Sequence, residues 1–388
     1  MLYWSTMPHN LATDIVIRED SKLPRLEGIA PISEAEIKAV ALGELEGLWP
    51  GIRRPPAVAG RGDETASASR EPWVDANAYQ AGYLRALYPN RPPVLAYLPD
   101  KLGDRSVPYD SLELALVESW AAGGNYILAV EPHYREALER KDPKAVAAWE
   151  QLGRTARWLR SNVALFRQPS IPIVIALVEP GVATAEIANL LYRRNVSPAL
   201  TGVIPAPDPQ KRLALVAANL KPPTTELVQR ILAHAEAGTT LIVATMPSQQ
   251  WWKVAGLKQV REEKDRDYYA LGKGQVVAYR RPIADPSEFA LDVIDIITHK
   301  QRAVRLWNAP AVIALATASP RPGEQLMHLL NYGSPIDSDV QARVQGHFSK
   351  ATLLRPDGEP IALKPAKRGT MTEVEVPELR RLGVVVFG

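Results

Sequence analysis

The sequence predicts an α/β protein built from three successive parts, and three patterns support this. Short apolar runs alternate with helical stretches as far as about residue 168, which is typical of βα units and a parallel sheet. A second alternation follows over residues 169–302, and residues 303–388 change to short alternating runs between turn signals. We therefore expect a parallel-sheet domain, a smaller doubly wound domain and a small antiparallel β-sandwich.

In the first part, strands and helices are expected in strict alternation. The expected elements are strand 14–20, helix 33–49, strand 55–60, helix 75–88, strand 93–100, helix 111–122, strand 125–132 and helix 144–162. Ser33 followed by Glu36 fits a capping box, in which each side chain satisfies a free amide of the first turn. Apolar residues recur at three- and four-residue spacing in the last helix and predict one buried face. These are Trp149, Leu152, Ala156 and Leu159.

The second part opens with an expected strand over 172–180 and a helix over 184–195. Residues 212–246 then predict a βαβ unit in which Gly238 ends the helix, because glycine adopts the left-handed conformation that helix ends require. The charged segment 260–282 is typical of a hairpin that ends in a strand, and we expect it at the edge of the sheet.

The third part contains several short runs of alternating polar and apolar residues. Turn signals separate them, such as Tyr332-Gly333-Ser334 and Pro356-Asp357-Gly358. Closely spaced short strands of this kind favour an antiparallel sandwich.

Composition excludes several classes of function. The 46 basic and 43 acidic residues are scattered, without the basic runs of nucleic-acid binders. The chain has no cysteine, which removes thiolate chemistry and cysteine-ligated zinc. No apolar window of about 18 residues occurs and the N-terminus lacks a signal pattern. We expect a soluble protein without nucleic-acid or membrane partners, in the cytoplasm or exported if a leader is missing.

Motifs for cofactors, metals and common nucleophiles are also missing. The chain has no G-x-G-x-x-G, no P-loop, no H-E-x-x-H and no G-x-S-x-G. We therefore expect no cofactor and no metal. The six histidines are far apart in sequence; His234 is expected at the surface, and His328 and His347 in the core or at the surface.

Five quoted segments together resemble multidomain glycoside hydrolases. GGNYILAVEP followed by LGRTARWLRSN is similar to the last strand and helix of alpha-L-fucosidase-like barrels. The middle part, with the last-part segments HLLNYGSP, LLRPDGEPIAL and VPELRRLGVVVF, resembles the amidotransferase-like trimerisation domain and C-terminal sandwich of microbial beta-galactosidases. The resemblance implies a partial or complete (β/α) barrel over 1–168, a flavodoxin-like domain over 169–302 and a β-sandwich over 303–388. It also implies a carbohydrate partner and a possible homo-oligomer formed through the middle domain.

Acidic residues follow the predicted barrel strands, where catalytic groups of such barrels lie. The candidates are Glu131, Asp100 and Glu19, with Asp20 next to Glu19. Glycoside cleavage needs two carboxyl groups, one as acid and one as nucleophile or base. Glu131 with Asp100 or Glu19 is therefore the expected catalytic pair.

The resemblance also suggests contacts to substrate. The candidates are Trp73, Asn125, Tyr97 and Glu71. Trp73 either stacks on a sugar or packs over the start of the next helix, and for Asp75 we favour a helix N-cap.

Length argues against a complete barrel. A (β/α)₈ barrel takes about 200–250 residues, whereas about 165 precede the second part and supply four or five strands. Either part of the barrel precedes this chain, or the barrel is reduced. Two functions remain open: a glycoside hydrolase, or a catalytically inactive carbohydrate-binding or assembly protein derived from one.

Overall fold

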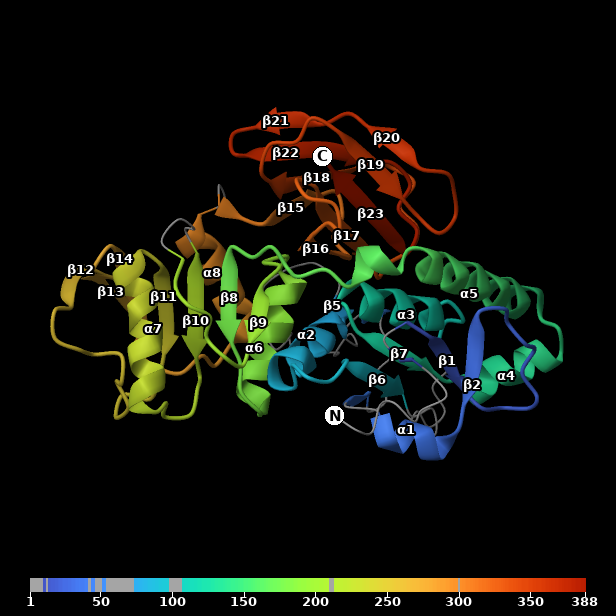
Figure 1. Cartoon of the computed structure of the whole chain (residues 1–388), viewed down its shortest axis with the longest axis horizontal. Helices are drawn as coiled ribbons and strands as arrows, with labels where there is room; N and C mark the ends of the chain where they lie inside the picture. Colours follow the sequence, from blue (N-terminus) through green and yellow to red (C-terminus); the bar gives the residue numbers. More distant parts are fainter. Residues whose placement is uncertain are drawn as a thin grey trace, which may run out of the picture.

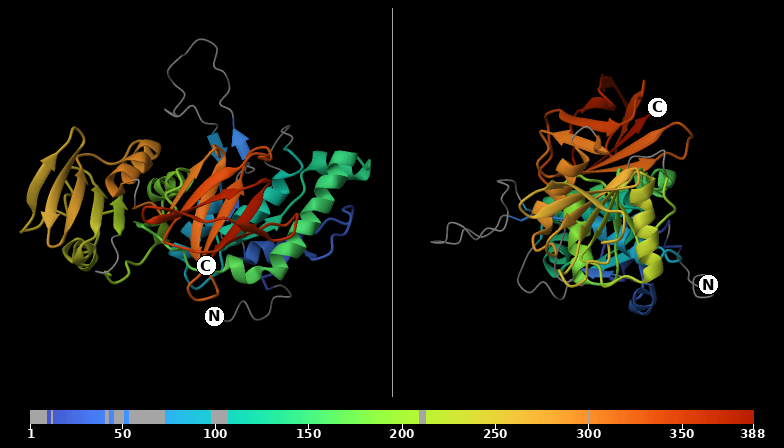
Figure 2. Two further views of the ribbon diagram at one scale, coloured as in Figure 1. Left: turned by 90° about the horizontal axis from the view of Figure 1, so that it is seen from above. Right: turned by 90° about the vertical axis from the view of Figure 1, so that its left-hand side faces the viewer.

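The structure is a computed structural model, and it describes residues 10–11, 13–40, 43–45, 51–53, 73–97, 107–208, 213–298 and 301–388. Figure 1 shows three bodies: the N-terminal and middle parts lie side by side, and the C-terminal part lies above both. The two further views in Figure 2 agree with this arrangement.

The N-terminal part is built around a parallel sheet with strand order β2-β1-β7-β6-β3. Its strands are β1 (Ile15–Arg18), β2 (Ile29–Ile32), β3 (Gly43–Leu45), β6 (Val94–Tyr97) and β7 (Asn125–Leu128). Its helices are α1 (Glu34–Val40), α2 (Ala78–Leu87), α3 (Ser111–Ala121), α4 (Pro132–Glu139) and α5 (Pro143–Ser161). Among the described residues, β2 and β3 each pair with one neighbour and form the two edges of the described sheet.

Two local predictions for this part are confirmed. The Ser33 amide donates to Glu36 Oε2 at 2.9 Å and the Glu36 amide donates to Ser33 Oγ at 3.4 Å, which is the capping box of α1. The apolar face of α5 is buried against the sheet and α3, with Leu159 fully covered. Burial of this face is what holds the helix on the domain.

Two others are wrong. The helix expected over 33–49 ends at Val40, and Gly43–Leu45 instead forms strand β3 beside β6, because sheet pairing overrides local helix propensity. Asp75 is not a helix N-cap: it ends strand β5 (Trp73–Asp75), which pairs with β4 (Gly51–Arg53), and Asn77 caps α2. The strand expected over 55–60 lies outside the described residues.

The middle part is a seven-stranded sheet with order β12-β13-β14-β11-β10-β8-β9. Its strands are β8 (Val174–Leu177), β9 (Ala199–Thr201), β10 (Ala214–Ala218), β11 (Thr240–Ala244), β12 (Lys258–Glu262), β13 (Arg266–Leu271) and β14 (Gly274–Tyr279). Its helices are α6 (Val182–Arg193), α7 (Thr225–Ala237) and α8 (Pro286–Ile297). The residues of β8 and β10 alternate between two separate cores, one under α6 and α8 and one under α7, so both faces are covered.

The details expected for this part are largely confirmed. Strands β10 and β11 pair in parallel and are joined in sequence by α7. Gly238 ends that helix with φ +121°. Strands β12 and β13 form the antiparallel edge. His234 is a correction: it is 1% exposed, and its Nε2 lies 2.9 Å from the Pro205 carbonyl oxygen, so it belongs to the interior and not the surface.

The C-terminal part contains two antiparallel sheets, with orders β15-β18-β22-β21 and β16-β17-β23-β19-β20. Its strands are β15 (Val304–Trp307), β16 (Val312–Ala318), β17 (Gln325–Asn331), β18 (Val340–Gln345), β19 (Ala351–Leu354), β20 (Ile361–Leu363), β21 (Ala366–Arg368), β22 (Met371–Val376) and β23 (Leu382–Phe387). Side chains from both sheets share one core. His328 is buried and His347 is exposed, within the range expected for them.

The outer face of the second sheet packs on the N-terminal part. Ile313, Leu315 and Leu330 belong to the same core as α3 and α5, so β17 is covered on both faces. Polar contacts join the same surfaces: the Tyr332 hydroxyl donates to Glu118 Oε2 at 2.7 Å. The C-terminal part therefore fixes one side of the N-terminal sheet.

Candidate functional site

The carboxyl edge of the N-terminal sheet gathers several of the predicted site residues. All its pairings are parallel, so the strands end at one edge. Glu131 follows β7 and immediately precedes α4, while Glu19 follows the neighbouring strand β1. Tyr97 is the last residue of β6, which places its backbone at the same edge.

Glu131 is a buried carboxyl group with spare hydrogen-bonding capacity. The residue is 4% exposed, and Oε1 has no hydrogen-bond partner among the described residues. Its side chain makes no capping hydrogen bond to α4. Burial raises the pKa of this carboxyl, although the backbone amides of His133 and Tyr134 favour the ionised form. A carboxyl of this kind can donate or accept a hydrogen bond, depending on its protonation.

Aromatic rings gather around the start of α4, the helix that Glu131 directly precedes. Tyr109 stacks on His133, with ring centroids 5.8 Å apart and a 3.3 Å contact between the hydroxyl oxygen and Nε2. Tyr109 also stacks on Tyr134 at 4.6 Å, and Tyr134 meets Trp149 edge to face at 6.0 Å. Tyr134 is buried, Tyr109 is half-buried and His133 is exposed. The inner rings thus fix an aromatic surface whose outer members reach solvent.

A second polar side chain with free atoms ends strand β1. Arg18 Nη1 pairs with Glu34 Oε2 at 3.1 Å. Its Nε and Nη2 are buried and make no hydrogen bond within the described part of the chain. Unpaired donors of Arg18 and an unpaired acceptor of Glu131 thus occur at the ends of neighbouring strands. Buried polar atoms are usually hydrogen-bonded, so both positions suit a ligand.

The acids that follow β1 differ from Glu131. Glu19 is exposed, and its amide donates to the Ile32 carbonyl oxygen at 3.0 Å. Asp20 accepts from Arg135 Nη1 at 3.2 Å and from the Lys22 amide at 3.0 Å. Asp20 therefore anchors α4 to the strand end, whereas Glu19 is available to solvent.

The remaining predicted residues fall in three places. Asn125 begins β7, at the opposite edge from Glu131, and is 1% exposed; its Nδ2 donates to the Leu11 and Asp14 carbonyls while its Oδ1 accepts from Trp120 Nε1. These contacts give Asn125 a structural role in place of the predicted substrate contact. Trp73 lies in β5, where its backbone pairs with Arg53. Asp100 and Glu71 lie outside the described residues.

Sequence patterns missed several of these groups. Tyr109 and His133 are 24 positions apart, and only the fold brings their rings together. Glu118 was also missed: it is fully buried on α3, and burial raises its pKa to about 7. Both of its oxygens accept hydrogen bonds, from the Asn77 amide, the Asn77 side chain and Tyr332, whereas Oε1 of Glu131 has no partner among the described residues. The segment EPHY after an apolar strand was the one local signal that pointed to the aromatic surface.

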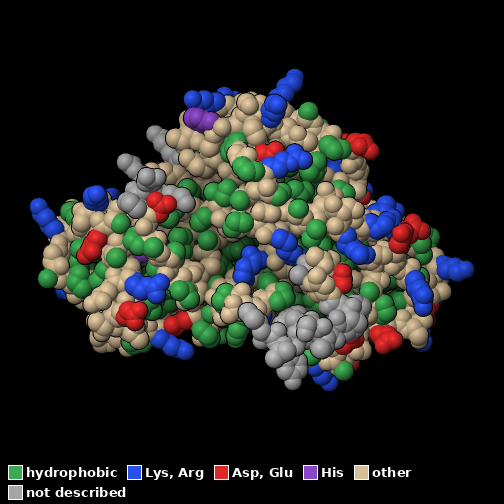
Figure 3. Space-filling view, in the orientation of Figure 1, with side chains coloured by type: hydrophobic (Ala, Val, Ile, Leu, Met, Phe, Trp, Pro, Cys, Tyr) green, Lys and Arg blue, Asp and Glu red, His purple; other side chains and the backbone are tan. Residues whose placement is uncertain are grey.

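The described residues offer neither a metal-binding cluster nor a membrane-spanning helix. No group of three or more His, Asp or Glu side chains is placed there to hold a metal ion. Among the same residues, no helix has both the length and the apolar character to cross a membrane. Acidic and basic side chains are interspersed on the face shown in Figure 3 and are not segregated by sign.

No family model matches the chain, and no curated protein matches it. Several solved structures, however, align with this chain. An alpha-L-fucosidase from Paenibacillus thiaminolyticus aligns with a TM-score of 0.55 and 10% identity, over 80% of this chain and 62% of that one. A beta-galactosidase from Bacillus circulans sp. alkalophilus aligns with a TM-score of 0.54 and 11% identity, over 80% and 58%.

A GH42 beta-galactosidase from G. stearothermophilus aligns with a TM-score of 0.51 and 12% identity, over 82% of this chain and 58% of that one. The chain thus spans only 58% to 62% of the length of these three structures. At such low identity the similarity concerns the fold. The fold of this chain is therefore multidomain and glycoside hydrolase-like, as the quoted sequence segments predicted.

Proposed function

We propose that this protein binds an oligosaccharide at the carboxyl edge of the N-terminal sheet. The observation that carries the proposal is the buried carboxyl of Glu131, whose Oε1 lacks a partner among the described residues. Glu131 directly precedes the helix that carries His133, which stacks on Tyr109. Sugars present hydroxyl groups that donate to a carboxylate and C–H faces that pack on aromatic rings. Arg18 adds unpaired donors for sugar oxygens at the same edge.

Ligand access to the buried oxygen is expected through side-chain rotation of the exposed His133, since rotamer changes are common where partners bind. In this proposal, residues 1–168 are a reduced or partial (β/α) barrel. The middle part is a flavodoxin-like domain over 169–302, and residues 303–388 form a β-sandwich. A homo-oligomer assembled through the middle domain belongs to the same proposal, and analytical ultracentrifugation of the chain tests it.

Hydrolysis is the second candidate function. The raised pKa of Glu131 favours it, because burial makes this carboxyl hold its proton more strongly, as the general acid of a glycosidase requires. A second carboxyl would come from Glu19 or Asp100. Of the described acids that follow β1, Glu19 is exposed and Asp20 is ion-paired, so neither shares the environment of Glu131. For this reason binding is the leading proposal.

The binding test compares Glu131→Gln with a matched control on the same helix. Glu136→Gln removes an exposed carboxyl whose partner is Arg140, four residues on. An array of immobilised oligosaccharides identifies a ligand for the unaltered protein, and calorimetry then measures Kd for each variant. We expect Glu131→Gln to weaken binding about tenfold, equivalent to about 1.4 kcal/mol, and Glu136→Gln to leave Kd unchanged. Equal affinity in all three proteins would exclude Glu131 from the site.

The same ligand then decides between the two functions. Incubation with the unaltered protein, followed by chromatography of the sugars, detects cleavage. Intact ligand after prolonged incubation supports binding alone. Turnover that is lost in Glu131→Gln and kept in Glu136→Gln supports hydrolysis, and aryl fucosides and galactosides are suitable first substrates given the names of the similar structures.

A further inference from the structure

A recess lies where the three parts of the chain meet. It has a volume of about 270 Å³, and α2, α6, the segment after α5 and strand β16 all contribute to its lining. Its polar lining residues are Arg85, Gln168, Ser170, Tyr192, Ser197 and Thr317. This recess is separate from the proposed carbohydrate site, because no residue of the carboxyl edge lines it.

Arg85 is the one charged residue that lines the recess. Its Nη2 donates to the Ala122 carbonyl oxygen at 2.6 Å, at the C-terminal end of α3. Within the described residues, Arg85 forms no ion pair with a carboxylate. Burial lowers the pKa of its guanidinium. A carbonyl dipole offsets only part of the free energy that a buried cation loses when it leaves water.

A second arginine increases the positive charge nearby. Arg167 stacks over the Trp120 ring at 4.7 Å and donates to the Gly124 carbonyl oxygen at 2.7 Å. Its pKa is lowered to about 10, first by burial and then by the charge of Arg85. Two cations that repel each other at the end of one helix create a local field that attracts an anion.

Hydroxyl donors accompany the charge. Tyr192 is only 6% exposed and lines the recess, and the charge of Arg85 acts on its hydroxyl. Room for it comes from Gly82, inside α2: a Cβ at that position would lie 2.6 Å from the Tyr192 oxygen. Glycine is unfavourable inside a helix, and here it leaves the space that the Tyr192 hydroxyl occupies.

We propose that this recess binds a small oxyanion, a phosphate or carboxylate group, through the Arg85 guanidinium and the Tyr192 hydroxyl. Arginine recognises such groups through paired N–H donors, and these charge-assisted bonds are the strong ones. The volume is below that of a typical drug-sized pocket, about 300–1,000 Å³, which fits a small ligand. Because all three parts line the recess, the bound anion also stabilises their arrangement.

The test uses the full chain and two probes, inorganic phosphate and acetate, each compared with sodium chloride at equal ionic strength. Calorimetry gives Kd, and thermal unfolding gives the shift in midpoint. Arg85→Met removes the guanidinium but keeps an unbranched chain, and Tyr192→Phe removes only the hydroxyl. Arg91→Met is the matched control, because Arg91 is exposed just after α2 and does not line the recess.

We expect at least one probe to bind the unaltered protein and raise its midpoint. The affinity should fall about tenfold or more in Arg85→Met and several-fold in Tyr192→Phe, and stay constant in Arg91→Met. Binding of phosphate alone, acetate alone or both identifies the preferred oxyanion. If neither probe differs from chloride, or if Arg91→Met weakens binding as much as Arg85→Met, the proposal is wrong. Should Arg85→Met not fold, Tyr192→Phe and Arg85→Lys carry the test.

Discussion

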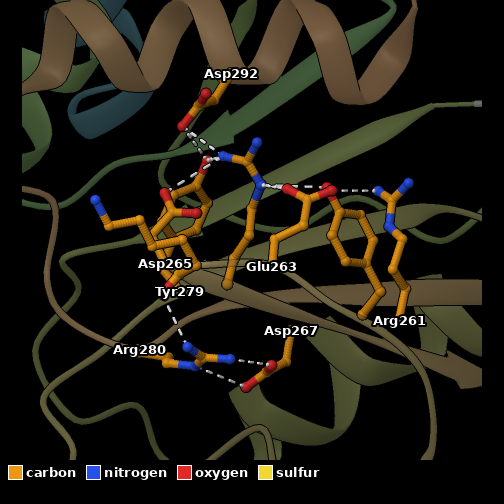
Figure 4. Close-up of polar contacts among 10 residues, drawn as sticks. Arg261, Glu263, Asp265, Asp267, Tyr279, Arg280 and Asp292 are labelled. Atoms are coloured by element: carbon orange, nitrogen blue, oxygen red, sulfur yellow. Dashed lines mark hydrogen bonds and ion pairs between the residues drawn. The ribbon is translucent and has the colours of Figure 1, made fainter.

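The carboxyl edge of the N-terminal sheet and the antiparallel edge of the middle sheet are both rich in charge, yet they differ in how that charge is satisfied. In the middle sheet, Arg266 Nε pairs with Glu263 at 2.8 Å, while Nη1 pairs with Asp292 at 2.6 Å and donates to the Tyr279 hydroxyl at 2.8 Å. Figure 4 shows Glu263, Tyr279 and Asp292 converging from the β12–β13 turn, β14 and α8.

Nearby, Arg280 meets Asp267 at 2.8 Å, as Figure 4 shows. Arg280 also meets Glu262 at 2.7 Å. At the N-terminal edge, by contrast, Glu131 and Arg18 keep buried atoms without partners in the described structure. A network in which each charge has its counterpart stabilises the fold. Unpaired buried atoms cost free energy unless a ligand satisfies them, so the comparison separates a structural charge cluster from a candidate binding site.

The largest expected effect is on stability, in the middle sheet. Arg266→Met leaves Glu263 and Asp292 without their cation, and we expect a loss of about 1.5–3 kcal/mol in the free energy of unfolding. Denaturant unfolding followed by circular dichroism measures it. Carbohydrate binding at the N-terminal edge should not change in this variant. A loss of binding together with unchanged stability would reverse the assignment of the two regions.

The second prediction concerns the pH dependence of stability in Glu131→Gln. Burial raises the pKa of Glu131 above its ordinary value of 4.5, so the folded state keeps a proton that the unfolded state releases. The stabilisation that this proton provides is present below pH 4.5 and is lost as pH rises through the raised pKa. The glutamine variant lacks this titration and should gain stability relative to the unaltered protein as pH rises. If the free energies of unfolding of the two proteins run parallel across the pH range, the pKa of Glu131 is not raised in the folded state.

A smaller effect is expected from the aromatic surface. Tyr109→Ala removes the ring that stacks on His133 and Tyr134, and a stacked aromatic pair contributes about 0.5–1.5 kcal/mol. We expect carbohydrate affinity to fall several-fold. Tyr109→Phe keeps the ring and should keep most of the affinity. If alanine and phenylalanine give the same Kd as tyrosine, calorimetry will have shown that the stack takes no part in binding.

The smallest effect is expected from Arg280→Met. Arg280 is exposed and its pairs are screened by water, so its loss should change the free energy of unfolding much less than the loss of Arg266 does. Comparing the denaturant unfolding of this variant with that of Arg266→Met shows whether burial controls how much each arginine contributes to the free energy of unfolding. A larger loss for Arg280→Met than for Arg266→Met would contradict that explanation.

The fold was predictable where local patterns agree with tertiary pairing. The βαβ unit whose helix ends at Gly238, the capping box at Ser33 and the charged hairpin were all found in the structure. The prediction was wrong where nonlocal contacts override propensity. Residues 43–45 follow a helix-forming run but pair with β6, and Asp75 pairs within a hairpin that no local signal indicates.

The candidate site was predictable only in part, for a related reason. Glu131 follows an apolar strand, so its place at the sheet edge could be inferred from periodicity and the parallel arrangement. Its burial and its unpaired oxygen depend on segments far away in sequence, as does the Tyr109–His133 stack. Arg85 and Tyr192 meet across two parts of the chain, which no sequence pattern of either helix reveals.

The most direct test of the central claim is a crystal structure of this chain with a bound oligosaccharide identified by array. We predict a sugar hydroxyl within hydrogen-bonding distance of Glu131 Oε1 and a sugar face against Tyr109 or His133. A sugar bound elsewhere on the molecule, with Glu131 still covered and its Oε1 still unpaired, would contradict the account.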